Sequence, residues 1–443
     1  MKLSKMAFSV ILALGISPMA GATDLLDIYH AAQSQDAVFA SARAAQQAGQ
    51  EKLTQGRSLL LPSVNLTANT TYNDVTTNYA HEYPPLLVSN NAKYNSHSYG
   101  ATLVQPLFRE QNWAAYNEAE LQVAISEAQF KLAEQDVILR SAQTYFDVLI
   151  AQDTIQLNAA QKTAISQQLE QAKRNFEVGT ATVTDTYEAQ ARYDLIGAQE
   201  LEAANNLEIK RRTLQQLVNG EVKDLNVLGK AFAMDNPVPA DVQKWVDDAQ
   251  HGNYQIAMAQ AAYELADKEV DRNRGGHLPT IDLVATTGKN IAGGGTLGAS
   301  DTHSNTIGVQ LNLPLFQGGA IQSKWREAEA NREKAKQDLE TTRRNVELQT
   351  RQAYLGVASG IAQVQALQQA LKSSESLLDA SKLGQQVGVR TSLDVLNAQQ
   401  QLFSTRRDLY QAQYNYLVSQ LRLKAAVGTL AEEDLGRVNM ALH

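Results

Sequence analysis

The stretch Val387–Gln399, read as V-G-V-R-T-S-L-D-V-L-N-A-Q, occurs a second time in this chain in altered form. Val178–Gln190 reads V-G-T-A-T-V-T-D-T-Y-E-A-Q, so both copies follow the pattern V-G-x-x-T-x-x-D-x-x-x-A-Q. The copies lie 209 positions apart (394 − 185 = 209). Duplication at a fixed offset predicts two structural repeats.

Each copy predicts the tip of a helical hairpin, because it lies between a long amphipathic segment and a shorter one. Gly179 and Gly388 supply the backbone freedom that a sharp turn needs. The threonine three places later can cap the next helix. Asp185 and Asp394 then stand at the start of the returning helices, where the helix dipole favours a carboxylate. Two ordinary helix caps facing solvent are the plain alternative.

Residues 1–22 read as an export signal that is absent from the mature chain. Lys2 and Lys5 precede the apolar run Ala7–Ile16, and Ala20-Gly21-Ala22 offers a cleavage site. The run is shorter than the ~20 apolar residues that span a bilayer as a helix. We therefore expect an exported chain without a transmembrane helix.

The composition excludes several classes of protein. The absence of cysteine rules out disulfides, thiolate metal sites and a lipid-modified N-terminal cysteine. The formal charge is 39 − 47 = −8, without a basic patch, so we expect no nucleic-acid partner. Only 6% aromatic residues and 9 prolines are typical of long helices with slim cores.

No residue constellation predicts an enzyme or a cofactor. Gly293–Gly298 matches G-x-G-x-x-G, but polar residues and a strand follow it rather than a helix, so a hairpin loop is favoured. The 7 histidines are scattered and have no metal-ligand spacing. No serine or aspartate lies in a nucleophile elbow.

Further paired landmarks divide the chain into two repeats. Leu61-Pro62 and Leu278-Pro279 each begin an alternating polar stretch, and a P-L-F triplet ends each stretch. The expected order within a repeat is helix, β-hairpin, long helix, turn and returning helix. The expected boundaries are repeat 1 at 23–225 with hairpin 62–106 and turn 178–183, a linker at 226–240, repeat 2 at 241–430 with hairpin 279–314 and turn 387–391, and a tail at 431–443.

Alternation of polar and apolar residues predicts the strands. In Thr306–Leu313 one face carries Ile307, Val309, Leu311 and Leu313. Two hairpins per chain are too few to close a barrel, but several chains together could close one. The other expected strands are Val64–Tyr72, Tyr99–Gln105 and Thr280–Thr287, and the expected loops are Tyr79–Asn95 and Gly288–Ser304.

The helical segments are too long for a globular domain. Asn112–Phe176 contains no proline or glycine, and at ~1.5 Å per residue it would be roughly 100 Å long. Its positions Ile125, Ala128, Leu132, Gln135, Leu139, Ala142, Phe146 and Leu149 form a coiled-coil seam in which only Gln135 is polar. The second long helix is expected at Ala320–Gln386, the returning helices at Thr184–Val218 and Ser392–Val427, and the helices before the hairpins at Leu25–Gly56 and Asp241–Arg274.

These residues resemble the TolC family of trimeric outer-membrane channels over nearly the whole mature chain. The resemblance is carried by Leu61-Pro62 and by the block G-H-L-P-T-I-D-L at 276–283. It is also carried by Val387-Gly388, Arg390-Thr391, Asp394-Val395-Leu396, Tyr414–Leu417 and Ala426–Leu430. It implies an α+β membrane protein in which three chains, each giving four strands, form one β-barrel continuous with a periplasmic α-helical barrel.

The resemblance also implies a gate at the periplasmic tips. Asp394 matches the first position of an acidic ring that could bind a blocking metal cation, and Asn397 stands where the second acidic position would be. Arg390 matches a linking arginine, and Thr184 and Asp185 match its partners. A linking tyrosine of the family appears here as Gln385.

The implied function is an outer-membrane exit duct for tripartite efflux pumps and type I secretion. Its implied partners are a periplasmic adaptor, an inner-membrane pump of the RND, ABC or MFS type, and outer-membrane lipid. The alternative is a periplasmic coiled-coil scaffold or adaptor, which would have one helical hairpin and small β domains. An exported enzyme is a third class, for which the sequence offers no site.

Overall fold

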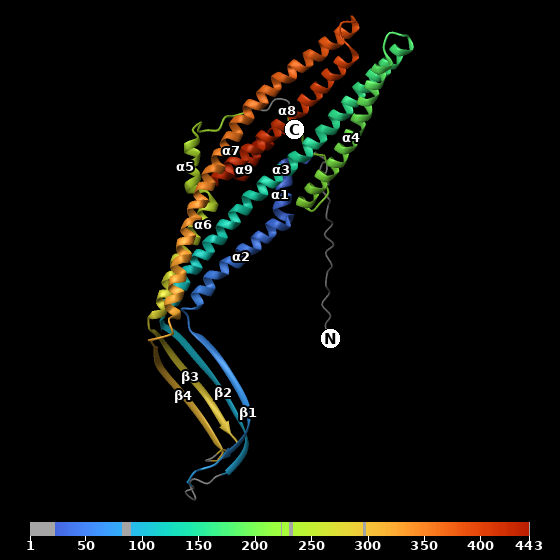
Figure 1. Cartoon of the computed structure of the whole chain (residues 1–443). Helices are drawn as coiled ribbons and strands as arrows, with labels where there is room; N and C mark the ends of the chain where they lie inside the picture. Colours follow the sequence, from blue (N-terminus) through green and yellow to red (C-terminus); the bar gives the residue numbers. More distant parts are fainter. Residues whose placement is uncertain (1–22, 82–89, 223, 230–233, 296–297, 443) are drawn as a thin grey trace, which may run out of the picture.

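The computed structural model describes residues 23–442, except 82–89, 223, 230–233 and 296–297. The expected export signal, part of the first expected loop and two residues of the G-x-G-x-x-G match lie outside the described residues. The molecule is long and narrow, with a β-sheet at one end and two helical hairpin tips at the other (Figure 1).

The elements follow the repeat order expected from the sequence. In the first repeat they are α1 (Leu25–Gln35), α2 (Ala37–Ser58), β1 (Ser63–Thr77), β2 (Asn90–Phe108), α3 (Glu110–Glu177) and α4 (Val183–Val218). In the second they are α5 (Val242–Gly252), α6 (Tyr254–Arg274), the short 3-10 helix η1 (Gly275–His277), β3 (Thr280–Ala292), β4 (Ser300–Asn312), α7 (Ala320–Gln386) and α8 (Ser392–Val427). The tail contains a further helix, α9 (Glu432–Asn439).

The four strands form one antiparallel sheet in the order β1-β2-β3-β4. The strands are longer than the alternation predicted, and parts of both expected loops belong to them. Polar residues that read as loop pair across the ladder instead. Lys93 bonds Asp74 at 3.0 Å, and Lys289 bonds Asp301 at 2.9 Å. Cross-strand pairs of this kind stabilise a sheet without any apolar side chain, so hydrophobic alternation alone underestimates the strand length.

One face of this sheet is apolar across all four strands. Directly paired residues of an antiparallel ladder point to the same face. The register pairs Val309 with Leu283, and Ile307 with Ala285, which in turn pairs with Leu103. Val309 is 65% exposed. The members of this apolar face are Val64, Leu66, Ala101, Leu103, Ile281, Leu283, Ala285, Ile307, Val309 and Leu311. The expected fourth member on β4, Leu313, lies just beyond the end of the strand.

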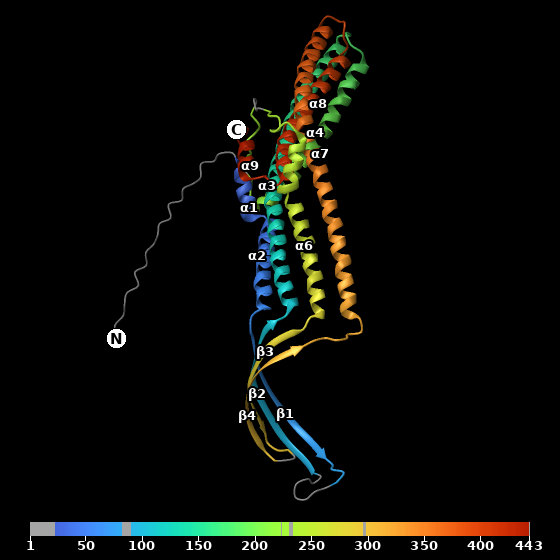
Figure 2. The ribbon, with the colours of Figure 1, turned by 90° about the vertical axis from the view of Figure 1, so that its left-hand side faces the viewer.

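The helices that lead from the sheet keep the order of the strands. α2, α3, α6 and α7 lie side by side, with α3 against α2 and α6, and α6 against α7 (Figure 2). Arg109, at the start of α3, joins the two repeats at this junction. Its Nε and Nη2 donate to the two carboxylate oxygens of Asp282 at 2.8 and 2.5 Å. A two-point bond of this type fixes geometry as well as adding energy.

Each helix that precedes a β-hairpin is broken once, where a single helix was expected. Asp36 and Asn253 have extended backbones, with ψ of 121° and 126°. Their side chains accept hydrogen bonds from the backbone N–H of Phe39 at 3.0 Å and of Gln255 at 2.8 Å. The breaks lie 217 positions apart (253 − 36 = 217), the same separation as Pro62 and Pro279 (279 − 62 = 217). Each polar side chain therefore caps a new helix in the middle of an otherwise helical sequence.

The main hydrophobic core lies partway along the helical part of the molecule, where α1, α5 and α9 pack around α3 and α8 (Figure 1). Its central side chains are Leu25, Tyr145, Phe146, Tyr416, Leu421 and Leu435, each at most 1% exposed. The tail expected at 431–443 is thus partly helical and packed. Among the described residues, no helix combines the length and the apolar character that crossing a membrane requires.

The predicted seam of the first long helix is confirmed, since none of its eight positions is fully exposed. Gln135, its single polar member, is 6% exposed, and its side-chain nitrogen has no hydrogen-bond partner. Ala142 and Phe146 are completely buried. The seam therefore faces the rest of the bundle, as periodicity of three and four predicts.

Candidate gate at the hairpin tips

The two repeated stretches form the tips of the two helical hairpins, α3/α4 and α7/α8 (Figure 1). Gly179 and Gly388 have φ of 76° and 79°, in the left-handed region that a side chain disfavours. Both tips are therefore sharp reversals that place the following threonine and aspartate at the start of the returning helix.

Each returning helix begins with a capping box. Asp394 Oδ2 accepts from the backbone N–H and the hydroxyl of Thr391, both at 2.9 Å. Asp185 Oδ2 accepts from Thr182 in the same way at 2.9 and 2.8 Å. The hydrogen bonds from Thr391 hold the pKa of Asp394 below its usual range. Asp394 is therefore charged at neutral pH and uses one carboxylate oxygen as a cap.

The second oxygen of Asp394 lies near Arg390. The distance from Arg390 Nη1 to Asp394 Oδ1 is 3.7 Å. The arginine side chain rests against Gly384, where an added Cβ would come within 2.6 Å of Arg390 Cγ. Within one chain, Arg390 thus lies beside its own Asp394 rather than beside Thr184 or Asp185. More than half of its side chain is exposed, so Arg390 is accessible to a neighbouring chain.

Asn397 lies one turn from Asp394, as expected, but its side chain is engaged. Its amide oxygen accepts a hydrogen bond from Arg192 Nη2 of α4 at 2.8 Å. The same guanidinium donates through Nη1 to Gln400. The sequence reasoning missed Arg192. One difference between the repeats could have drawn attention to Arg192. The equivalent position of the second repeat (192 + 209 = 401) is the uncharged Gln401, so the arginine is specific to the first repeat.

Apolar packing joins the hairpins at the same place. Leu396 of α8 is 3% exposed and belongs to a cluster formed mainly by the first hairpin. The other members of this cluster are Ile165, Leu169, Ala172, Ala189 and Ile196, with Tyr193 at its edge. Gln385, expected in place of a linking tyrosine, donates to Ser392 of its own hairpin at 3.0 Å.

Two further bonds join the hairpins nearer the core. Tyr414 of α8 donates its hydroxyl to Asp153 Oδ2 of α3 at 2.8 Å, and Arg422 bonds Gln143 at 2.9 Å. Burial raises the pKa of Asp153, and the Tyr414 hydroxyl offsets part of this rise. Burial and the adjacent carboxylate also raise the pKa of Tyr414, so Tyr414 remains the donor.

Tyr414→Phe is expected to destabilise the protein more at neutral pH than in mild acid. A raised pKa means that Asp153 stabilises the folded state fully below its unfolded pKa, and this contribution is lost as pH rises through the folded pKa. Without the hydroxyl, the ionised carboxylate has lost a hydrogen bond worth about 1.5–3 kcal/mol. Thermal unfolding at pH ~7 and ~4 measures the difference, since a carboxyl with a pKa above ~3.9 is partly protonated at the lower value. An equal loss of stability at both pH values would contradict this account.

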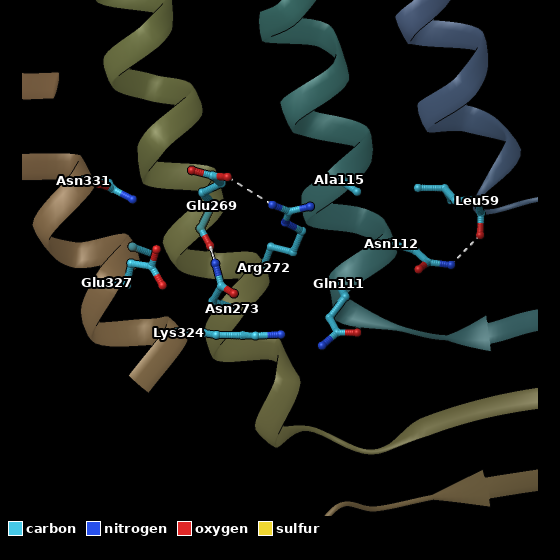
Figure 3. Close-up of a pocket in the computed structure, with 11 residues that line it drawn as sticks. Leu59, Gln111, Asn112, Ala115, Glu269, Arg272, Asn273, Lys324, Glu327 and Asn331 are labelled. Atoms are coloured by element: carbon cyan, nitrogen blue, oxygen red, sulfur yellow. Dashed lines mark hydrogen bonds and ion pairs between the residues drawn. The ribbon is translucent and has the colours of Figure 1, made fainter. Parts of the chain in front are cut away.

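A polar hollow of about 570 Å³ lies at the other end of the helices, where they meet the sheet (Figure 3). Arg272 of α6 binds Glu269 at 3.1 Å, and its Nε lies 3.0 Å from the buried Glu118. Lys324 and Glu327 of α7 line the same hollow. Burial raises the pKa of Glu118. None of the gate residues expected from the sequence lies in this hollow.

One chain does not complete a metal site. Within the described part of the chain, no group of three or more His, Cys, Asp or Glu side chains could hold a metal ion. Each chain supplies one Asp394, at the tip of its second hairpin, so a cation-binding ring there requires several copies of the chain.

Comparison with known proteins identifies the architecture. The model of the family described as "Outer membrane efflux protein" matches residues 28–220 and 245–429, and so covers both hairpins and the sheet. The chain belongs to the outer membrane efflux protein family. It is therefore an outer membrane protein, and the sequence resemblance to the TolC family is confirmed.

Individual relatives extend over almost the whole chain. The chain is 33% identical to Outer membrane protein TolC of Escherichia coli (strain K12), covering 97% of this chain and 87% of that protein. It is 34% identical to Alkaline protease secretion protein AprF of Pseudomonas aeruginosa, covering 94% and 86%.

The fold itself matches a solved channel. The crystal structure of the Campylobacter jejuni CmeC outer membrane channel superposes with a TM-score of 0.80 at 17% identity, covering 100% of this chain and 98% of the other. The present chain is mostly helical with a small four-stranded sheet, as the sequence predicted.

Proposed function

We propose that three copies of this chain form an exit duct through the outer membrane and the periplasm. The observation that carries the proposal is the four-stranded sheet, which has two open edges and an exposed apolar face. Open edges inside a bilayer would leave backbone groups without partners, so the edges must pair with other chains. Three such sheets supply about twelve strands, a number that closes an outer-membrane barrel. The helices continue from the strands in the same order, and would extend the barrel as a tunnel.

The assembly is tested by fractionation. We expect heat-modifiable trimers in the outer-membrane fraction. A soluble monomer in the periplasm would contradict the duct and favour the scaffold or adaptor alternative. Two helical hairpins and an apolar-faced sheet support the duct, because an adaptor needs neither.

The duct would serve a tripartite system with a periplasmic adaptor and an inner-membrane pump. The names of the relatives support two substrate classes: AprF is named for alkaline protease secretion, and TtgC of Pseudomonas putida for toluene efflux. A deletion strain decides between them. Increased sensitivity to toxic compounds indicates efflux, and loss of secreted proteins from the medium indicates type I secretion.

The tips would close the duct through Arg390. In the trimer, we propose that Arg390 bonds Thr184 or Asp185 of a neighbouring hairpin and holds the tips inward. Support comes from the exposure of Arg390 and from Asp185, whose Oδ2 is used by the capping box while its other oxygen stays available. A charge-assisted bond of this kind contributes roughly 1.5–3 kcal/mol when partly buried.

Arg390→Ser is expected to raise single-channel conductance in planar bilayers, because the closed arrangement loses a bond in each of the three chains. Lys382→Ser is the matched control, since Lys382 is an exposed cation on the same hairpin. Wild-type conductance in the Arg390 variant would show that Arg390 is not a latch.

A further inference from the structure

We infer that Arg192 is a positioning residue of the gate, which ties the two hairpins of one chain together and keeps Asn397 from acting as a free ligand in the pore. The inference rests on the proposed duct. The resemblance assigns position 397 to the ring, whereas the contacts assign it to this tie.

The tie is a two-point contact between α4 and α8. Arg192 Nη2 donates to Asn397 Oδ1 at 2.8 Å, while Nη1 donates to Gln400 Oε1. Asn397 and Gln400 are three residues apart and therefore lie on one face of α8. A planar guanidinium that bonds two acceptors restrains the orientation as well as the distance of the two helices.

Leu396 reinforces the tie from the adjacent face. It is 3% exposed and packs among Ile165, Leu169 and Ile196 of the first hairpin. Consecutive residues of α8 thus give one apolar and one polar contact to the same partner. A movement that separates the hairpins must expose Leu396 and break both bonds of Arg192 together.

The contact of Arg192 lies near the tips of the two hairpins. In the described part of the chain, the next side-chain hydrogen bonds that join the two hairpins are Tyr414–Asp153 and Arg422–Gln143, which lie further from the tips, toward the hydrophobic core. At each tip, a capping box fixes the first turn of the returning helix. Of the side-chain hydrogen bonds that join the hairpins in the described residues, those of Arg192 therefore lie closest to the tips.

The tie also decides what a charge at position 397 would do. Asn397 is neutral, so Arg192 keeps its full positive charge beside the proposed Asp394 ring. A carboxylate at position 397 would instead form an ion pair with Arg192 and would be largely neutralised for a cation in the pore. Only removal of Arg192 would release that carboxylate to act with Asp394.

The test uses the assembled trimer in planar bilayers with La³⁺ added from the periplasmic side. Arg192→Gln should increase conductance. Asn397→Asp alone should lower conductance, and it should tighten the La³⁺ block no more than Arg192→Gln does, since each change removes or cancels one positive charge beside the ring. The double variant should be blocked severalfold more tightly than the combined effects of the two single variants predict, because only there is the carboxylate free to bind the ion. A merely structural role of Arg192 would give independent, additive effects of the two positions on the block.

Arg174→Gln is the matched control, because Arg174 is an exposed arginine near the tip of the same hairpin. It should behave as wild type. If Asn397→Asp tightens the block as much with Arg192 present as it does in the Arg192→Gln background, the inference is overturned. Wild-type conductance in Arg192→Gln would overturn it as well.

A second measurement is independent of conduction. The chain has no cysteine, so Arg192→Cys together with Gln400→Cys introduces a single pair for a short bis-maleimide. The linker should join the two hairpins within one chain, as peptide mapping would show. Links found only between chains, or none, overturn the tie. The two proposals can fail separately. If the double-cysteine variant forms the intrachain link but the wild-type protein forms no channel, the tie is supported and the duct is refuted.

Discussion

Arginine in place of Val309 is expected to abolish most of the assembled trimer in the outer membrane. Val309 lies at the middle of the apolar part of β4, and it is 65% exposed on the face shared with Leu283. If this face meets lipid near the bilayer midplane, an arginine costs about 2–4 kcal/mol. The cost applies to each of three copies in one barrel, so the assembly loses the sum.

Gln310→Arg is the control, because the adjacent residue points to the opposite, polar face of the same strand. Its trimer yield should be close to wild type, since the polar face would line water. Heat-modifiable trimer in the outer-membrane fraction is the measured quantity. Equal yields for the two variants would refute the lipid-facing assignment of the apolar face.

Removing the carboxylate of Asp394 is expected to abolish both cation preference and block by multivalent cations. Three copies around one axis would place three carboxylates in a narrow aqueous constriction, which concentrates cations and can surround a hard ion with oxygen ligands. The depressed pKa of Asp394 keeps these groups charged at neutral pH. Asp394→Ala should therefore shift the reversal potential toward a non-selective value and should remove the block from the periplasmic side.

A second variant separates the ring from the cap. Asp394→Asn keeps a side-chain oxygen that can accept the bonds from Thr391, but it removes the charge. It should lose the block as completely as Asp394→Ala does. Asp379→Ala, which removes an exposed acid elsewhere on the same hairpin, should leave the block unchanged. If Asp394→Asn retains wild-type block, Asp394 acts as a helix cap only.

Much of the architecture was predictable because it follows from local rules. The seam of the first long helix was readable from its three- and four-residue steps, and the tips from a glycine, a threonine and an aspartate at fixed spacing. The breaks at Asp36 and Asn253 were not predicted. A polar residue within a helical pattern can face solvent or can cap a new helix, and the choice depends on what packs around it. The full length of the strands was missed for a related reason, since their outer parts are held by cross-strand polar pairs.

In the candidate gate, too, some features follow from local sequence and others depend on how the helices pack. Local sequence patterns were enough to predict the duplicated tips, the capping aspartates Asp185 and Asp394, and the separation of Asp394 from Asn397 by one helical turn. All of these depend on residues close together in the chain. The partner of Asn397, in contrast, could be found only from the way the two hairpins pack. Arg192 lies 205 positions from Asn397 in the sequence. The two residues meet because the two long hairpins pack against each other at a particular angle. Local propensity carries no information about that angle, because it is set by packing such as that of Leu396 in the neighbouring hairpin.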